Sequence, residues 1–379
     1  MNNCTTCGQE IEPPRQICMA CSARRNRRFT LAAIIGGAAL IAAIAFTQRG
    51  GGAKDEETPG GPVRIVDEYH GGGGPAVDKN APSPAEAPAI AGCDAAAIHK
   101  LVAEYNNSDA LVAAVRAGTA FQAKCTRSSR LDWDILYALE HLERWKEAEA
   151  ISDRLLKEDP SDSDFWWWRG KDRRFLGQHD RALADLRQSL ADATDRSNGV
   201  QIDYIDASAQ AIGKRCETAF ALRWLTTRGV ELRDSAQREF NEIFLGSHCV
   251  ALDGHGQVTW AASGMKRTKV NGKLGGKKIV AMIDPGLGTT LVRRSVADDR
   301  KLARGADLDV LTPTGLGTGA ATSGDLSVGG ATATDVPMAI VDELPDGVDV
   351  VVGLSFLWRF DVQPSPDGER MVAREPASD

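Results

Sequence analysis

A short stretch in the C-terminal third constrains the fold of this chain most, because it joins an apolar strand to a carboxylate. Residues Ile279–Ile283 are all apolar, which predicts a buried strand, and the next residue is Asp284. A turn that contains Gly286 and Gly288 follows directly. Glycine allows the backbone to turn tightly and to be approached closely. The stretch therefore predicts an acid presented at the end of a strand, although Asp-Pro-Gly also occurs where a chain simply turns.

Several segments around this stretch carry a further pattern in their order and spacing. In chain order they are Val270–Gly272, Ile283–Gly286, Ala297–Leu302, Leu326–Gly330, Val336–Met338 and Val352–Leu357. Together they resemble the retropepsin-like aspartic proteases, in particular the bacterial membrane-anchored branch, over residues Thr268–Pro376. The resemblance implies that residues 250–379 form an all-β retropepsin-like barrel domain with aspartic endopeptidase activity, in which Asp284 is catalytic.

The resemblance also implies how the site is completed. Aspartic proteases activate a water molecule between two carboxylates that share one proton, one acting as base and the other as acid. The chain offers one such aspartate, which implies a homodimer with Asp284 of each subunit on the two-fold axis. Contacts to a peptide or protein substrate are expected from Gly286, and from Gly317 and Thr318 in a hairpin that would form a flap.

The central triplet departs from the family pattern. Pro285 stands where the family has Thr or Ser, and Leu287 stands where it usually has Ala or Ser. The hydroxyl of the family bonds across the paired loops of the dimer, whereas proline has neither a hydroxyl nor a backbone N–H. Two alternatives therefore accompany the endopeptidase hypothesis. One is a catalytically inactive pseudoprotease scaffold that binds peptides or protein partners, and the other is a structural β-domain without a peptide groove.

Half of the eight cysteines lie near the N-terminus in two Cys-x-x-Cys pairs. They are Cys4, Cys7, Cys18 and Cys21. Each pair can place two thiolates on one side of a metal, and two pairs complete a tetrahedral Zn²⁺ site. Residues 1–23 therefore predict a small zinc ribbon with structural zinc as its cofactor. A redox dithiol, or cysteines without a joint role, is the alternative.

The segment 29–46 carries no charge and consists almost wholly of Ala, Ile, Leu and Gly. As a helix it would be about 27 Å long, close to the thickness of a bilayer core. Arginines at positions 24, 25, 27 and 28 precede it, which predicts a cytoplasmic N-terminus. We expect an uncleaved transmembrane helix in the cell membrane, with the later domains extracytoplasmic, that is, periplasmic. A signal peptide cleaved after Ala43–Ala45 is the alternative.

The next segment, 47–92, is rich in glycine and proline and cannot build a core, so it predicts a flexible linker. The net charge of the whole chain is −7, which gives no indication of general nucleic-acid binding.

Residues 93–249 predict an all-α domain, because apolar residues recur at helical spacing between Asp132 and Asp159. The related pieces Trp145–Ala148 and His179–Ala182 end 34 residues apart, which is the period of tetratricopeptide repeats. The resemblance implies paired helices that present substrate or bind protein partners. The three tryptophans at 166–168 are open to two interpretations, a ligand groove or the core between helices.

The four remaining cysteines would lie beyond the membrane in this topology, where an even number suits disulfides. They are Cys93, Cys125, Cys216 and Cys249. Three connectivities are open, and sequential pairing (93 with 125, 216 with 249) is the simplest. Buried free thiols are the alternative.

Overall fold

A computed structural model of the chain describes residues 2–3, 10–11, 92–191, 199–227, 242–243, 249–261, 268–366 and 370–376. The chain divides into two compact units, Met1–Glu68 and Tyr69–Asp379. In the first unit, β1 (Asn2–Asn3) pairs antiparallel with β2 (Glu10–Ile11). The four predicted zinc ligands, the apolar segment 29–46 and the predicted linker up to residue 91 lie outside the described residues. Within the described part of the chain, no helix is long and apolar enough to cross a bilayer.

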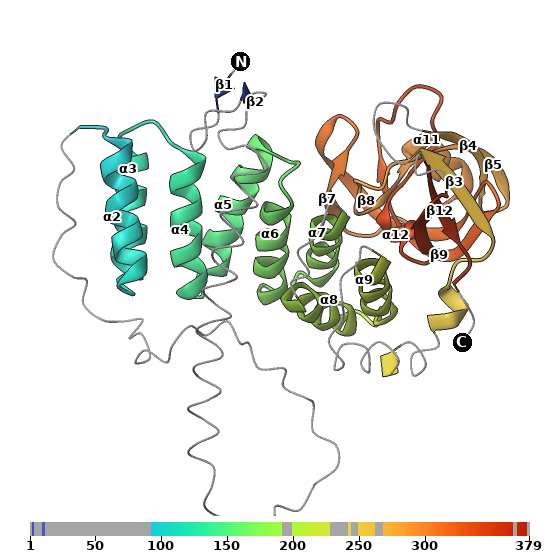
Figure 1. Cartoon of the computed structure of the whole chain (residues 1–379), viewed down its shortest axis with the longest axis horizontal. Coiled ribbons are helices and arrows are strands. Elements are labelled where there is room, and N and C mark those ends of the chain that lie inside the picture. The colour runs from blue at the N-terminus through green and yellow to red at the C-terminus, as the bar shows by residue number, and fades with distance from the viewer. Residues whose placement is uncertain are drawn as a thin grey trace, which may run out of the picture. The chain divides into compact units, whose positions relative to one another are not determined.

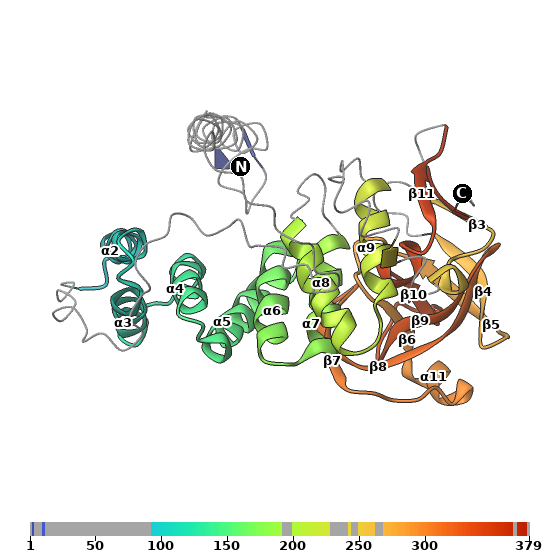
Figure 2. The same cartoon turned by 90° about the horizontal axis from the view of Figure 1, so that it is seen from below.

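The middle of the chain is helical, as the periodicity predicted (Figure 1). The helices described there are α2 (Ala95–Asn107), α3 (Leu111–Gln122), α4 (Ser129–His141), α5 (Trp145–Glu158), α6 (Ser163–Phe175), α7 (His179–Ala191), α8 (Gly199–Ala211) and α9 (Cys216–Thr227). Figures 1 and 2 show α2 to α7 side by side in chain order. Three of these helices begin with a side-chain cap, in which Asp94, Ser128 or Asp162 accepts a backbone N–H of the first turn. The assignment of this stack to tetratricopeptide repeats stays a prediction.

Small residues set the close spacing of helices α6 and α7. A Cβ at Gly170 would lie 2.8 Å from Leu186 Cγ, so the absence of a side chain lets the helices approach each other. Gly177, with φ of +75°, turns the chain between them, and a left-handed conformation of this kind suits glycine. Trp166 is buried and donates from its indole N–H to the Pro160 carbonyl over 2.8 Å. The interpretation of Trp166 as part of the core between helices is therefore confirmed.

The C-terminal domain is a closed barrel. A seven-stranded sheet has the order β4-β5-β10-β6-β9-β8-β7, and β4 also pairs with β8, which closes the sheet. Its strands are β4 (Lys269–Leu274), β5 (Lys277–Ile283), β6 (Thr290–Arg293), β7 (Asp307–Thr312), β8 (Gly315–Val328), β9 (Ala331–Val341) and β10 (Val350–Val352). A three-stranded sheet adds β11 (Asp361–Pro364), β12 (Arg370–Arg374) and β3 (Gln257–Ala261). The helical segments in and before the barrel are α11 (Arg294–Arg300), α12 (Leu354–Leu357) and the 3₁₀ turn η1 (Cys249–Leu252).

The barrel and the last helices share one hydrophobic core. Phe220 and Trp224 of α9 belong to the same buried cluster as Phe356 and Trp358 at α12. Burial of such large aromatic side chains strongly stabilises the contact between the two parts. The first helices form a separate core that includes Ile98 and Leu155. The helical region therefore has one end that packs within itself and one end that packs on the barrel.

Two disulfides confirm the sequential pairing. Cys93 pairs with Cys125, and Cys216 pairs with Cys249. The second disulfide joins the N-terminus of α9 to η1, where the chain enters the barrel domain. It therefore links covalently the two parts that already share a core.

Candidate active site

Asp284 lies where β5 ends beside β10. The two strands are parallel, with Ile283 opposite Val352, and the backbone N–H of Asp284 donates to the Val352 carbonyl over 3.0 Å. The side chain is half-buried, and its Oδ1 accepts the backbone N–H of Gly286 over 3.3 Å. The strand pairing and this short turn together fix the direction in which the carboxylate points. The sequence-based prediction of a strand that ends on this acid describes the local structure correctly.

The segment after β10 holds the loop after Asp284 through backbone hydrogen bonds. Leu354 N–H donates to the Leu287 carbonyl over 2.7 Å, and Ser355 N–H donates to the Gly288 carbonyl over 3.0 Å. The Ser355 hydroxyl accepts the N–H of Thr290 over 2.9 Å. Thr290 and Ser355 are buried positioning residues that our sequence reasoning did not select. A hydroxyl shortly after each of the two glycine turns is the signal that would have found them.

The hairpin expected to form a flap is present as β7 and β8. Thr318 pairs with Asp309 across this hairpin, and Gly317 pairs with Val310. Gly317 and Thr318 line a cavity of about 540 Å³ that also touches Lys157 and Pro160 of the helical region. Asp284 and Gly286 are not among the residues that line this cavity. The structure thus places Gly286 beside the candidate acid, whereas Gly317 and Thr318 face a different space.

Helix α7 packs directly on the loop after Asp284. The Gln188 side-chain amide donates to the Gly286 carbonyl over 2.8 Å, and the side-chain oxygen accepts the Gly288 N–H over 2.6 Å. A Cβ at Gly288 would lie 2.4 Å from Gln188 Cα, so the helix backbone rests directly on the glycine. One residue earlier, Arg187 reaches Thr289 Oγ1 at 3.4 Å. Our sequence reasoning missed Gln188, because a glutamine within an amphipathic helix belongs to no motif.

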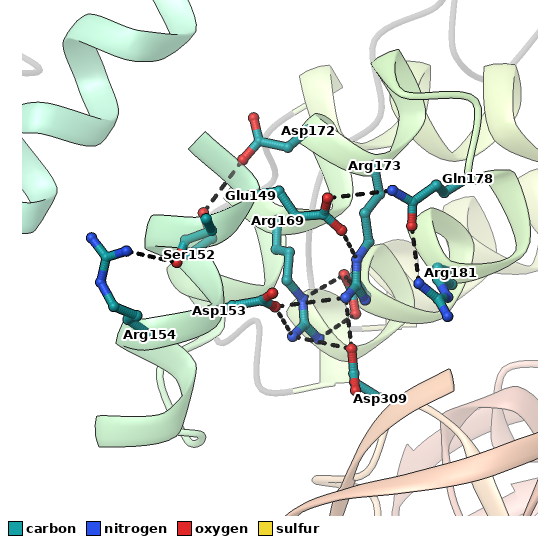
Figure 3. Close-up of polar contacts among 12 residues, drawn as sticks. Glu149, Ser152, Asp153, Arg154, Arg169, Asp172, Arg173, Gln178, Arg181 and Asp309 are labelled. Atoms are coloured by element: carbon teal, nitrogen blue, oxygen red, sulfur yellow. Dashed lines mark hydrogen bonds and ion pairs between the residues drawn. The ribbon is translucent and has the colours of Figure 1, made fainter. Parts of the chain in front are cut away.

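An ionic cluster, formed by Arg169, Arg173, Asp185 and Asp309, joins the helical region to β7. Figure 3 labels Arg169, Arg173 and Asp309 of this cluster. Arg173 of α6 donates to Asp309 Oδ2 over 2.6 Å. Burial opposes ionisation of Asp309, but Arg169 and Arg173 outweigh it and hold the pKa of Asp309 below its usual value. The stabilisation from this carboxylate is therefore present above about pH 4 and is lost as the pH falls through the lowered pKa.

A pair of carboxyls, Glu140 and Asp172, is buried between α4 and α6. Burial raises the pKa of both groups, and the neighbouring Glu140 raises that of Asp172 further. Glu140 Oε1 and Asp172 Oδ1 have no other hydrogen-bond partner, so a proton shared between them satisfies both. Among the described residues, no group of three or more His, Cys, Asp or Glu side chains could hold a metal ion. We interpret the pair as a structural element of the helical region.

The raised pKa values give a testable dependence of stability on pH. Both carboxyls ionise near pH 4 in the unfolded chain but only at higher pH in the folded chain, so stability falls as the pH rises above about 4. We expect Asp172→Asn, which resembles the protonated acid, to make the free energy of unfolding at pH 8 larger by about 1 kcal/mol or more. Urea titrations at pH 5 and pH 8 measure this, with Asp164→Asn on the exposed face of α6 as the control for lost charge. Equal pH dependence in Asp172→Asn and the wild type would rule out the shared proton.

Comparison with known families bears on the barrel and on Asp284. No curated protein matches the chain. Residues 270–356 match the family model described as aspartyl protease, and this segment runs from β4 into α12. It contains Asp284, the loop on which α7 rests and the β7–β8 hairpin. The C-terminal domain therefore resembles the aspartyl proteases both in this match and in its closed barrel.

Proposed function

We propose that the chain is a membrane-anchored aspartic endopeptidase in which Asp284 activates water for attack on a peptide carbonyl. The observation that carries this proposal is the placement of Asp284 at the end of β5, bonded to β10, within a barrel that matches the aspartyl protease family. A carboxylate held by backbone bonds at the end of a strand has the fixed direction that general acid–base catalysis requires.

The second carboxylate comes from a second copy of the chain. Two Asp284 side chains close together cannot both ionise, so the pair shares one proton and divides the roles of base and acid. A membrane anchor at residues 29–46 would favour this homodimer by raising the local concentration of the protein. The two disulfides of the described chain support an extracytoplasmic, periplasmic location for the helical and barrel domains.

A structural zinc ion at the N-terminus belongs to the same proposal. Two Cys-x-x-Cys pairs supply four thiolates, which is the donor set of a closed structural zinc site. Zinc would stabilise a segment too short to bury a core of its own.

The second candidate function is a binding scaffold without catalysis. Pro285 favours it, because proline supplies neither the hydroxyl nor the N–H with which the two loops of a dimer would bond. In that case the helical region would bind peptides or protein partners, and the barrel would only support it.

The substitution Asp284→Asn separates these two functions. We expect the full-length chain to cleave members of a peptide library, and the Asn variant to be slower by a factor of about a hundred or more, because an amide cannot act as a base. Cleavage products are identified by mass spectrometry, and circular dichroism verifies that the variant is folded. Cleavage that survives in Asp284→Asn, or no cleavage by any variant of the chain, contradicts the endopeptidase proposal.

A further inference from the structure

The loop beside Asp284 presents one binding position for an extended peptide. The Gly286 carbonyl and the Gly288 N–H lie on either side of Leu287 in the sequence. In a parallel sheet, a residue of the neighbouring strand bonds to the C=O before and the N–H after one such residue. These two backbone groups are therefore the pair that one residue of an added strand would use, through its own N–H and C=O.

The side chain of Gln188 occupies this position. Its carboxamide donates to the Gly286 carbonyl over 2.8 Å and accepts the Gly288 N–H over 2.6 Å. A carboxamide presents an N–H and a C=O side by side, as the N–H and C=O of one residue do on one edge of a strand, so Gln188 reproduces the bonds of a bound peptide. Gln188 is 5% exposed, which shows that the contact is within the protein and not at its surface.

Helix α7 also fills the apolar surface next to the loop. Ala184, one turn before Gln188, is buried in a cluster with Leu287 of the loop and Val310 of β7. A peptide strand needs about 4.8 Å between itself and its neighbour. Gln188 Cα lies only 2.4 Å from the position of a Cβ on Gly288, so no strand fits between α7 and the loop.

A second set of contacts holds the same helices to the flap hairpin. Arg173 donates to Asp309 of β7 over 2.6 Å, and Arg181 of α7 donates to the Asp307 carbonyl over 3.0 Å. Helix α7 thus contacts the loop after Asp284, and α6 and α7 together contact β7 of the hairpin, where Figure 3 shows Arg173 beside Asp309.

We propose that helix α7 is a built-in inhibitor of the protease domain, with Gln188 imitating the N–H and C=O of one residue of a substrate. The inference rests on the proposed endopeptidase function. A substrate binds when α7 leaves the loop. The energy of the Gln188 and Asp309 contacts determines the fraction of molecules in which α7 is separated from the loop. Inhibition by α7 explains why a helix of the helical region packs on the residues that directly follow Asp284.

The substitution Gln188→Glu tests the contact with almost no change in shape. A carboxylate faces the Gly286 carbonyl with an acceptor instead of a donor, so we expect α7 to separate from the loop. In the full-length chain, hydrogen exchange at the Gly288 N–H should become faster by about tenfold or more. The N–H of Asp284, which bonds to Val352, should keep its rate and so verify that the barrel is intact. Gln257→Glu on the exposed face of β3 is the matched control for charge.

The second variant approaches the same contact from the loop. In Gly288→Ala, the new Cβ meets backbone atoms of α7, which no side-chain rotation can relieve. We expect both variants to cleave a peptide library about tenfold or more faster than the wild type, and we expect Asp284→Asn to abolish the gain.

The outcomes separate the inhibitor from the protease. Unchanged exchange at Gly288 in Gln188→Glu overturns the inference, whatever the activity. Faster exchange with equal, Asp284-dependent cleavage by wild type and variants also overturns it, while the proposed function stands. Faster exchange without cleavage by any variant contradicts the proposed endopeptidase function, and the inference of an inhibitor is then contradicted as well.

Discussion

Gly353→Ala should unfold the barrel domain or reduce its free energy of unfolding by more than about 4 kcal/mol. A Cβ at this position would lie 2.5 Å from the Leu287 carbonyl oxygen and 2.8 Å from that of Thr289. Both are backbone atoms of the loop after Asp284, so no side chain can move aside. The backbone of Gly353 is extended, with φ of −109°, which shows that the position needs space and not an unusual conformation.

Relief of this clash would move the loop and break the bonds that support it. Leu354 N–H would lose the Leu287 carbonyl, and the Gly353 N–H would lose the Thr290 hydroxyl, which it now reaches at 3.1 Å. Urea denaturation followed by tryptophan fluorescence measures the loss. Gly324→Ala is the control, because the nearest atom to its Cβ is the flexible end of Met338 at 3.3 Å. A stability within about 1 kcal/mol of the wild type for Gly353→Ala would mean that the loop does not rest on this segment.

Local patterns in the sequence predicted the strand, the acid and the helices. The strand before Asp284 and the glycine turn after it are determined by residues that are close together in the sequence, and the structure has both. For the disulfides and for Trp166 the sequence left alternatives open, and the structure has the sequential pairing and the core position. The family pattern of the barrel was also visible, because its strands and glycine turns keep a characteristic order.

The packing of the helices on the barrel could not be predicted. Gln188 and Gly288 are 100 residues apart, and neither carries a signal that points to the other. The shared core of Phe220 with Trp358 was likewise not visible, because hydrophobic periodicity shows which face of a helix is buried but not against what. The sequence therefore predicted helices and strands that the structure has, but it gave no indication of the interface that covers the candidate site.

Asp185→Asn should reduce the free energy of unfolding by about 3–5 kcal/mol. Asp185 of α7 is fully buried and accepts two bonds from Arg169, at 2.9 and 2.8 Å, and one from Arg173 at 2.9 Å. Both arginines are at most 3% exposed in their side chains. Removal of the central carboxylate would leave two buried guanidinium groups close together with their charge only partly compensated. Removing one partner of a buried ion pair destabilises a protein far more than replacing the whole pair by apolar residues does.

The control for this prediction lies in the same cluster. Asp153 accepts a bond from Arg169 over 2.8 Å, but its side chain is 38% exposed, so water can replace it. We expect Asp153→Asn to cost no more than about 1 kcal/mol. Because Arg173 also holds Asp309 of β7, the loss in Asp185→Asn should loosen β7 together with the helices, and amides of β7 should exchange faster. If Asp185→Asn costs no more than Asp153→Asn, then apolar packing and not the buried charges holds α6 and α7 together.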